Sequence, residues 1–378
     1  MPPVPRANAI LHVCAGNQFG GVESMLVTIA RTSSAAPRLP HDFACCFEGR
    51  FSQALHSSGT PPFLLPGVRL SRPWDILRAR AALRRLVSSL EPSVIVTHSA
   101  WTRLVFGRSL VHSSRGSTLP TVAWIHGASS PLSRLDRWGQ RPRPDLVLLN
   151  SRHTGALTET LFPGSPRQVL YCPVPPPTPS SPAARQTLRQ WLGATPDQRV
   201  LLIAARLEPW KGHELLLDGL AALPTSANWM CWIAGGPQTT EQTAYLDALR
   251  QRAQRLGIAN RVVFLGERQD VPQLMSAADV YCQPNLGPEP FGVVFVEALY
   301  AGLPVVTTAL GGALEILNDD CGRLVPPGNA AFLAQTLNAL LGNPELRAQL
   351  GANGPARARE LCDPTARLIE LEQHLLGP

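Results

Sequence analysis

Lysine is almost absent from this sequence. Of the 34 lysine and arginine residues in the 378-residue chain, Lys211 is the only lysine. Codon preference would explain the excess of arginine but not this exception. A lysine ammonium is a compact, strongly hydrated point charge on a flexible stem, which suits contact with a phosphate group. Lys211 is therefore either an ordinary solvated charge or a residue with a specific contact, and its neighbours must decide between them.

Several signatures of secreted, metal-binding and membrane-spanning proteins are also missing. The eight cysteines form no Cys-x-x-Cys pair, and several lie in apolar runs such as "ILHVCAG", which favours buried reduced thiols over disulfides or zinc sites. The N-terminal apolar run is too short for a secretory signal, and no run has the length that spans a bilayer. We expect a cytoplasmic protein, which could still lie peripherally on the inner face of the cytoplasmic membrane.

Acidic residues are fewer than basic ones, 27 against 34, so the net charge is +7. This excess suits anionic ligands or an anionic membrane surface. Nucleic acid is not expected as a partner, because the arginines are scattered and no nucleic-acid-binding motif occurs. The hydrophobic fraction of 44% and the charged fraction of 16% indicate a globular chain.

Short β-rich runs alternate with longer helical patterns in both halves of the chain, as in parallel α/β folds. The chain is too long for one ordinary core, and the proline-rich stretch "CPVPPPTPSSP" separates the halves. We therefore expect two Rossmann-like, doubly wound parallel-sheet domains that face each other across a cleft, with ligands at the carboxyl ends of the strands. The expected domains cover residues 1–171 and 199–355, with a linker and the start of the second domain over 172–198 and a C-terminal helix over 356–378 that packs back toward the first domain. Six strands are expected in each half, near residues 10–14, 42–47, 63–65, 94–97, 122–125 and 146–149, and near residues 200–205, 230–234, 262–265, 280–283, 305–308 and 323–325.

The segment from Arg72 to Leu90 combines apolar residues at helical spacing with five arginines. A basic amphipathic helix can attach to anionic lipid, so this segment could contact a membrane. The alternative is a helix that covers a sheet and exposes a solvated arginine face.

Two loops that follow predicted strands have the composition of anion-binding sites. The first, "CAGNQFGGVES", is not the G-x-G-x-x-G of dinucleotide-binding folds, but Gly20 and Gly21 would let the backbone approach a ligand at a helix start. A tight turn would need the same glycines. In the second, "AARLEPWKGHE", Arg206 leaves the strand end and Lys211 precedes a helix, so both could converge on one diphosphate.

The stretch "YCQPNLGPEPFGVVFVEALYAG" holds two acids with seven residues between them. Its Pro and Gly content predicts a loop, and we expect a helix from Phe291 onward. Glu289 then lies at the helix mouth and Glu297 two turns inside, where both could bind polyol hydroxyls. The unpaired amides of Phe291, Gly292 and Val293 would point at a ligand. The alternative is a helix-starting acid and a solvated one.

Five stretches occur in an order that resembles the retaining GT-B glycosyltransferases of family four, glycosyl transferases group 1. They are "RLEPWKGHELLL", "IAGGP", "RVVFLGERQDVPQLMSAADVYCQPN", "EPFGVVFVEALYAGLPVVTTALGGALEIL" and "GRLVPPGN". In the first half, "GGVES", "WIHG" and "NSRHT" fit the same pattern. The resemblance implies a hexosyltransferase-type enzyme that moves a sugar from a nucleotide-sugar donor to an acceptor. It implies that residues 1–171 bind a saccharide or glycolipid acceptor, that residues 199–355 bind the donor, and a bacterial polysaccharide or glycoconjugate product.

The same resemblance implies roles for individual residues. Arg206 and Lys211 would hold the donor diphosphate, Glu289 the donor sugar, and Glu297 the ribose hydroxyls. The 291–293 amides would contact the sugar or the diphosphate. The remaining implied positions are Arg268 near the nucleotide base, His126 at the donor sugar, Gly21 near the diphosphate, and Ser151.

From the residues alone His126 has two readings. It follows the apolar run "TVAWI" and precedes a glycine, so it lies at a strand's carboxyl end, although a lone histidine is more often structural. No Asp-x-Asp pair occurs, which fits transfer without a metal or other cofactor, with cationic side chains offsetting the charge of the departing phosphate. Two rival functions stay open: a sugar-nucleotide epimerase on the same fold and a non-catalytic nucleotide-sugar-binding subunit.

Overall fold

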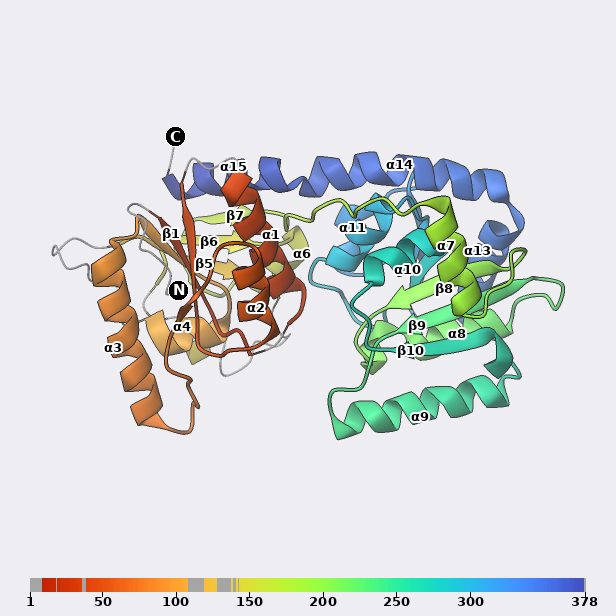
Figure 1. Cartoon of the computed structure of the whole chain (residues 1–378), viewed down its shortest axis with the longest axis horizontal. Coiled ribbons are helices and arrows are strands. Elements are labelled where there is room, and N and C mark those ends of the chain that lie inside the picture. The colour runs from red at the N-terminus through yellow and green to blue at the C-terminus, as the bar shows by residue number, and fades with distance from the viewer. Residues whose placement is uncertain are drawn as a thin grey trace. The chain divides into compact units, whose positions relative to one another are not determined.

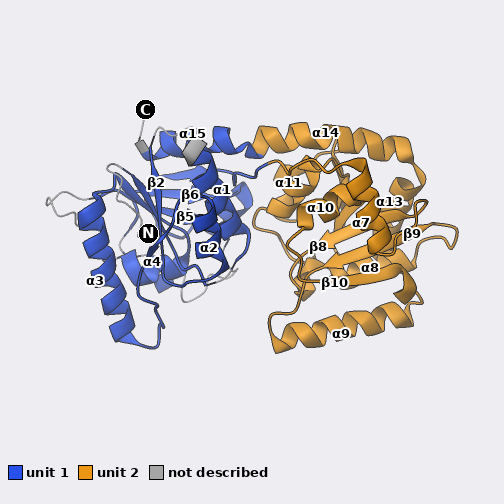
Figure 2. Cartoon of the chain, in the orientation of Figure 1, with its two compact units in different colours: residues 1–175, 362–378 blue, residues 176–361 orange. Residues whose placement is uncertain are grey.

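The computed structural model of the protein describes residues 9–17, 19–35, 39–107, 119–127, 137–138, 141 and 143–376. The chain forms two compact units (Figure 2). Unit 1 consists of Met1–Pro175 together with Cys362–Pro378, and unit 2 of Pro176–Leu361. Among the described residues, no helix has both the length and the apolar character needed to cross a membrane.

Unit 1 is built on a parallel sheet of seven strands in the order β3-β2-β1-β4-β5-β6-β7. Figure 1 labels β1, β5, β6 and β7 of this sheet. The order reverses between β1 and β4, and open α/β sheets bind ligands outside the carboxyl ends of the strands at such a point. The elements are β1 (Ile10–Cys14), α1 (Gly21–Ala35), β2 (His41–Cys45), α2 (Arg50–Ser57), β3 (Phe63–Leu64), α3 (Pro73–Leu90), β4 (Val94–Thr97), α4 (Ala100–Phe106), β5 (Thr121–Ile125), β6 (Leu146–Leu149), α6 (Arg152–Leu157), β7 (Arg167–Val169) and α15 (Pro364–Leu376).

Unit 2 has a parallel sheet of six strands in the order β10-β9-β8-β11-β12-β13. Its order reverses between β8 and β11, and its inner strands are buried on both faces, as in doubly wound folds. The elements are α7 (Pro182–Trp191), β8 (Arg199–Ala204), the 3₁₀ turn η2 (Pro209–Lys211), α8 (His213–Ala221), β9 (Trp229–Ala234), α9 (Thr240–Arg255), the 3₁₀ turn η3 (Ala259–Arg261), β10 (Val262–Gly266), α10 (Val271–Ala277), β11 (Val280–Gln283), α11 (Val293–Tyr300), β12 (Val305–Thr308), α12 (Ala313–Ile316), β13 (Gly322–Val325), α13 (Ala330–Gly342) and α14 (Pro344–Cys362).

The structure differs from the sequence-based expectations at three places. The first half has a seventh strand, β7. It is only three residues long and partly exposed, so it lacks the apolar run by which the other strands were predicted. The segment expected as one helix over 356–378 is divided at Asp363 between α14 and α15. The helix expected from Phe291 begins at Val293, because Gly292 adopts a left-handed conformation with φ 107°.

Candidate active site

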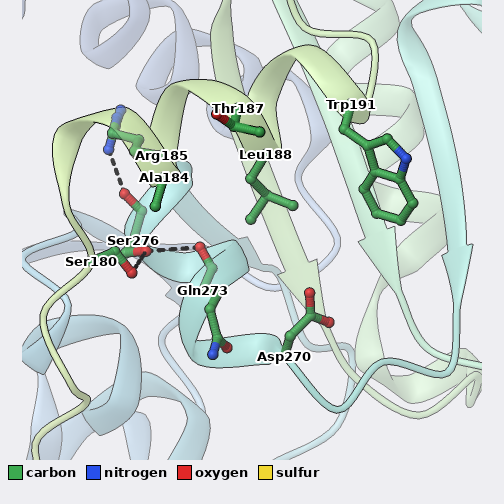
Figure 3. Close-up of a pocket in the computed structure, with 9 residues that line it drawn as sticks. All are labelled: Ser180, Ala184, Arg185, Thr187, Leu188, Trp191, Asp270, Gln273 and Ser276. Atoms are coloured by element: carbon green, nitrogen blue, oxygen red, sulfur yellow. Dashed lines mark hydrogen bonds between the residues drawn. The ribbon is translucent and has the colours of Figure 1, made fainter.

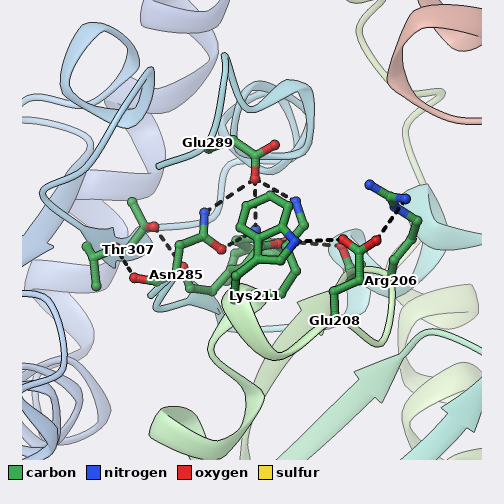
Figure 4. Close-up of polar contacts among 11 residues, drawn as sticks. Arg206, Glu208, Lys211, Asn285, Glu289 and Thr307 are labelled. Carbon is green, nitrogen blue, oxygen red and sulfur yellow. Dashed lines mark hydrogen bonds and ion pairs between the residues drawn. The ribbon is translucent and has the colours of Figure 1, made fainter. Parts of the chain in front are cut away.

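Lys211 is held in a buried ion pair at the carboxyl end of β8 (Figure 4). Its side chain lies at the end of η2, and the whole residue is only 8% exposed. Nζ donates to Oε2 of Glu289 over 2.6 Å and lies 3.9 Å from the ring centroid of Trp210. A charge this buried is almost always paired. The reading of Lys211 as an ordinary solvated charge is therefore wrong.

Glu289 also accepts hydrogen bonds from two uncharged side chains at the end of β11. The side-chain amides of Asn285 and Gln283 lie 3.3 Å and 3.5 Å from the same Oε2 atom. Thr307 and Thr308 at the end of β12 hold this loop, because their hydroxyls donate to the carbonyls of Gln283 and Asn285 (Figure 4). A carboxylate fixed by a cation and two amides is preorganised, and exchange of these donors for ligand hydroxyls would need little movement.

Gln283 and Asn285 are essentially fully buried, and neither was among the expected site residues. The only signal for them in the sequence is a pair of amide side chains directly after the apolar run of β11. Their burial, together with their contact to Glu289, makes them part of the site.

Arg206 lies near this cluster but engages a different acid. Its guanidinium pairs with Glu208 over 2.9 Å, and 57% of the side chain is exposed. Glu208 in turn accepts from Nε1 of Trp210 over 2.9 Å. Figure 4 shows Arg206 and Glu208 on the side of Lys211 away from Asn285. An exposed arginine in a weak ion pair can swing to a ligand at low cost.

The start of α11 is shaped by a close approach of two backbone segments. The amide of Gly312 donates to the carbonyl of Glu289 over 2.8 Å, and Glu289 pairs with Gly311 as an isolated parallel bridge. Phe291 is buried, and a Cβ on Gly292 would lie 2.4 Å from the ring of Phe295. Of the three amides expected at the helix mouth, that of Val293 belongs to the first turn of α11.

Glu297 lies one turn into α11 and is half-buried. Burial raises the pKa of its carboxyl group to about 7. A neutral carboxyl group can both donate and accept, whereas a carboxylate only accepts. At neutral pH the residue therefore exchanges between two hydrogen-bonding modes.

We expect Glu297→Gln to stabilise the protein at pH 8 but not at pH 5. A raised pKa means that the folded state holds more protons than the unfolded state, so stability falls as the pH rises from the ordinary glutamate range through about 7. Glutamine removes this loss. The gain in the thermal unfolding midpoint over wild type should be larger at pH 8 than at pH 5 by about 3 °C. The matched control Glu345→Gln, at an exposed position of α14, should show no such growth; equal gains at the two pH values would contradict the assignment.

Arg268 does not join the Lys211–Glu289 cluster through any hydrogen bond or ion pair in the part of the chain that the structure describes. Its guanidinium forms a two-point contact with Asp270, at 2.7 and 2.6 Å, and lies 5.2 Å from the ring centroid of Trp191. The hydrogen bonds that Arg268 donates to the Asp270 carboxylate raise the pKa of Arg268. Beside this pair is a hollow of about 380 Å³ between α7 and the α10 region, lined among others by Leu188, Trp191 and Asp270 (Figure 3). None of the expected site residues lines it.

In unit 1, Ser151 and Gly20 both make hydrogen bonds to residues nearby in the chain. Ser151 is fully buried and caps α6, because its hydroxyl oxygen accepts from the amide of Thr154 over 2.9 Å. The amide of Gly20 donates to Glu23 over 3.0 Å, and α1 begins at Gly21. The cap explains a serine at position 151 without a ligand, whereas the amide contact of Gly20 is one that any residue could make.

A hollow of about 370 Å³ lies at the switch point of the unit 1 sheet, at the strand ends where ligands were expected, although none of its lining residues was among the expected site residues. Cys14 at the end of β1 and His98 after β4 line it, together with Glu23, Phe47 and Trp101. Its position is the one at which open α/β sheets bind ligands. An acid beside aromatic rings suits a saccharide, which has hydroxyl groups and apolar ring faces.

His126 follows β5 and is half-buried. Its Nε2 atom lies 3.1 Å from Nδ1 of His98, and burial lowers its pKa to about 3. The imidazole is therefore neutral. Within the described residues, no group of three or more His, Cys, Asp or Glu side chains could hold a metal ion.

Comparison with known proteins gives a match to each half of the chain. Residues 184–357 match the family model of glycosyl transferases group 1, and residues 19–177 match that of Glycosyltransferase Family 4. A phosphatidyl-myo-inositol mannosyltransferase from Mycobacterium leprae is 38% identical over 163 residues, which cover 42% of this chain and 41% of that protein. A D-inositol 3-phosphate glycosyltransferase from Mycobacterium marinum is 34% identical over 188 residues, which cover 49% of this chain and 38% of that protein. The matched stretches thus span less than half the length of these two relatives.

Among solved structures, HepE from Anabaena, in complex with UDP and glucose, has a TM-score of 0.84 and 26% sequence identity. The match covers 98% of this chain and 100% of that one. A sucrose-phosphate synthase from Thermosynechococcus elongatus shares the fold with a TM-score of 0.79 over 98% of each chain. With two parallel-sheet units, both family models and these neighbours, the chain has the GT-B fold and belongs to the family-four glycosyltransferases of group 1.

Proposed function

We propose that this protein is a retaining glycosyltransferase that moves a sugar from a nucleotide-diphosphate sugar to a hydroxyl group of a saccharide or glycolipid, in bacterial polysaccharide or glycoconjugate biosynthesis. One observation carries the proposal: the only lysine of the chain is buried against Glu289 at the carboxyl edge of the unit 2 sheet. A buried cation with one acidic partner is suited to exchange that partner for a diphosphate.

The proposed steps use the contacts described above. The donor diphosphate draws Nζ of Lys211 from Glu289, and the exposed Arg206 swings from Glu208 to the same anion. Glu289 then accepts from hydroxyl groups of the donor sugar, while Glu297 contacts the ribose and Arg268 lies near the base. Both cations stabilise the charge that grows on the departing nucleoside diphosphate, which is where electrostatic stabilisation is most effective.

The acceptor hydroxyl then attacks from the face that the phosphate leaves. A phosphate oxygen of the leaving group takes the proton of the acceptor, so the configuration at the sugar carbon is retained. The acceptor site is the switch-point hollow of unit 1, where the ring of Trp101 offers a stacking surface and Glu23 accepts from a hydroxyl.

We further propose that transfer needs no bound metal ion, because two cationic side chains can supply the positive charge that a divalent ion supplies elsewhere. Activity in excess EDTA, compared with activity in Mg²⁺ or Mn²⁺, tests this directly. A loss of turnover on chelation that added metal restores would overturn it.

The donor is tested first by thermal shift with UDP, GDP and ADP sugars. UDP-glucose is the first choice, since HepE is 26% identical and its structure contains UDP and glucose. Labelled donor with saccharide and glycolipid acceptors then follows, with the product's anomeric configuration determined by NMR. Transfer with retention supports the proposal. Epimerised nucleotide sugar would identify an epimerase, and binding without any turnover would identify a non-catalytic subunit.

We propose peripheral contact of the cytoplasmic protein with an anionic membrane surface through α3. One expected feature of this helix needs correction: Arg80 is not on a solvated face, because it donates to the carbonyls of Leu104 and Val105 in α4. The exposed face instead combines Trp74, which is 76% exposed, and Leu77 with Arg84 and Arg85. This mixture of apolar and basic side chains is typical of interfacial helices.

We expect the double variant Arg84→Glu, Arg85→Glu to lose binding to anionic vesicles by about tenfold or more, since each basic residue near such a surface contributes about 1 kcal/mol. Flotation with phosphatidylglycerol-containing vesicles measures this. The matched control is Arg250→Glu, Arg255→Glu on α9, which changes the net charge equally at two exposed positions. Equal losses in the two variants would show a general charge effect and exclude α3 as the contact.

A further inference from the structure

Four neighbouring strands of the unit 1 sheet each contribute one histidine to a continuous row. His41 is the first residue of β2, His12 lies in the middle of β1, His98 follows β4, and His126 follows β5. In the sheet these strands are adjacent in the order β2-β1-β4-β5. The row therefore crosses the sheet diagonally, from the amino end of one strand to the carboxyl end of another.

Each contact in the row joins Nε2 of one ring to Nδ1 of the next. Nε2 of His126 lies 3.1 Å from Nδ1 of His98, and Nε2 of His98 lies 2.9 Å from Nδ1 of His12. Nε2 of His12 lies 2.8 Å from Nδ1 of His41. A neutral imidazole has one donor and one acceptor nitrogen, so the protons along such a row must all point the same way. Only two arrangements exist, one the reverse of the other.

Burial favours the neutral form of all four rings. Burial lowers the pKa of His12 and His98 well below the ordinary value, and the neighbouring histidines lower both further. It also lowers the pKa of His41, although Glu372 acts in the opposite direction, and that of His126 to about 3. Glu372 is the acidic side chain within ion-pair distance of the row in the described part of unit 1.

Glu372 breaks the symmetry between the two arrangements. Its side chain is buried on α15, where Oε1 accepts from the amide of Leu39 over 3.4 Å and lies 3.8 Å from Nε2 of His41, at ion-pair distance but beyond hydrogen-bond distance. The negative charge of an ionised carboxylate at this distance attracts an N–H group and repels a nitrogen lone pair. A proton on Nε2 of His41 is therefore favoured, whereas a lone pair there would face the carboxylate. Because each neutral ring has one donor and one acceptor nitrogen, the tautomer of His41 fixes the tautomer of each following ring in the row.

We propose that Glu372, His41, His12 and His98 are positioning residues that hold His126 as the Nε2–H tautomer, so that its Nδ1 atom is a pure acceptor for a ligand hydroxyl group. In the described residues, Nδ1 of His126 is buried and has no hydrogen-bond partner. A neutral acceptor repels phosphate oxygens and accepts from O–H groups, so the ligand group is a hydroxyl of the sugar, which rests on the proposed function. Phosphate contacts are left to Arg206 and Lys211.

The tautomer can be measured without any catalytic assay. In protein labelled with ¹⁵N-histidine, we expect the Nδ1 resonance of His126 to be that of an unprotonated nitrogen, with His126→Asn giving the assignment. His12→Phe interrupts the row and should shift His126 toward the other tautomer. His12→Gln keeps a donor and an acceptor and should restore the wild-type state. His213→Phe, a buried histidine of unit 2, is the matched control and should change nothing at His126.

Two results would overturn the proposal: a protonated Nδ1 at His126 in the wild-type protein, or an unchanged tautomer in folded His12→Phe. If His12→Phe does not fold, two other spectra test the proposal. One is the wild-type spectrum, and the other is that of Glu372→Gln, which removes the anionic end of the row. Because these spectra need no substrate, they stand even if the proteins show no transfer. Failure of the proposed function is therefore distinguishable from failure of this inference.

Kinetics tests the consequence for the ligand. Loss of one hydrogen bond made in both the ground and transition states should raise the donor KM of His12→Phe about tenfold with little change in kcat. Donors in which single sugar hydroxyls are replaced by hydrogen should include one that wild type and His12→Phe use equally well. His12→Gln should recover the wild-type KM for the full donor. A fall in kcat alone, or no deoxy donor that equalises the two proteins, would contradict the assigned contact.

Discussion

Lys211→Arg should lower the turnover of labelled donor by about a hundredfold or more, the scale on which single preorganised charge contacts act in transition states, while the fold stays intact. The ammonium lies between Oε2 of Glu289, at 2.6 Å, and the ring of Trp210, at 3.9 Å. A planar guanidinium is larger and directs its donors differently, so it cannot occupy this place and still reach a diphosphate. Initial rates with saturating donor, together with the thermal midpoint, measure both parts of the expectation.

The matched control is the reverse exchange, Arg206→Lys. Arg206 is exposed and contacts only one acid in the described structure, so a lysine there keeps the charge and can reach the same ligand. We expect a loss of about tenfold, the value of one charge-assisted hydrogen bond. If the two exchanges had equal effects, or if Lys211→Arg retained near-normal rates, the buried position of the single lysine would be incidental.

A neutral replacement at position 211 is less informative. Removing one partner of a buried ion pair leaves an unpaired charge, at a cost of about 3–5 kcal/mol in stability. Glu289 would keep only the longer contacts to Asn285 and Gln283. Lys211→Ala would thus mix a folding defect with a catalytic one, whereas Lys211→Arg keeps the charge.

The strands were predictable to within two residues because buried parallel strands are short apolar runs separated by polar loops. β7 has only one apolar residue of three and escaped this rule. The start of α11 was placed too early because the sequence "PFGVV" does not reveal that Gly292 takes a left-handed conformation. Around Gly292 the chain is packed against Phe295, and the neighbouring Glu289 pairs with Gly311, which is a tertiary contact that the local sequence does not show.

Residues of the candidate site were predictable from the sequence only where charged side chains lie in a loop directly after a predicted strand. Lys211, Glu289 and Arg206 stand in loops after strands, and such loops gather at one edge of a parallel sheet. The row of histidines carried no such signal. His12, His41, His98 and His126 are separated by at least 28 residues, and only the strand order brings them together. Strand order is decided by packing of the whole sheet, which no local pattern records.

The turn that places Lys211 depends on the missing side chain of Gly212. This residue has φ +78°, and a Cβ atom there would lie 1.8 Å from the carbonyl oxygen of Pro284. The Pro284–Leu286 loop is held against this turn, because the amide of Leu286 donates to the carbonyl of Trp210 over 2.7 Å. The two loops that carry Lys211 and Asn285 are thus in backbone contact at this glycine.

We expect Gly212→Ala to lower the free energy of unfolding by about 3 kcal/mol or more, since about 1–2 kcal/mol of left-handed strain adds to an overpacking cost of about 1–3 kcal/mol. Because the loops must separate, donor binding should also be lost. The matched control is Gly257→Ala: φ is +72° there, but a Cβ atom meets nothing within 4 Å, so only the strain remains. Urea unfolding of both variants and thermal shift with donor measure the difference. If both variants lost the same stability and both still bound donor, left-handed strain alone would account for the result, and the contact with Pro284 would not be what holds Lys211 beside Glu289.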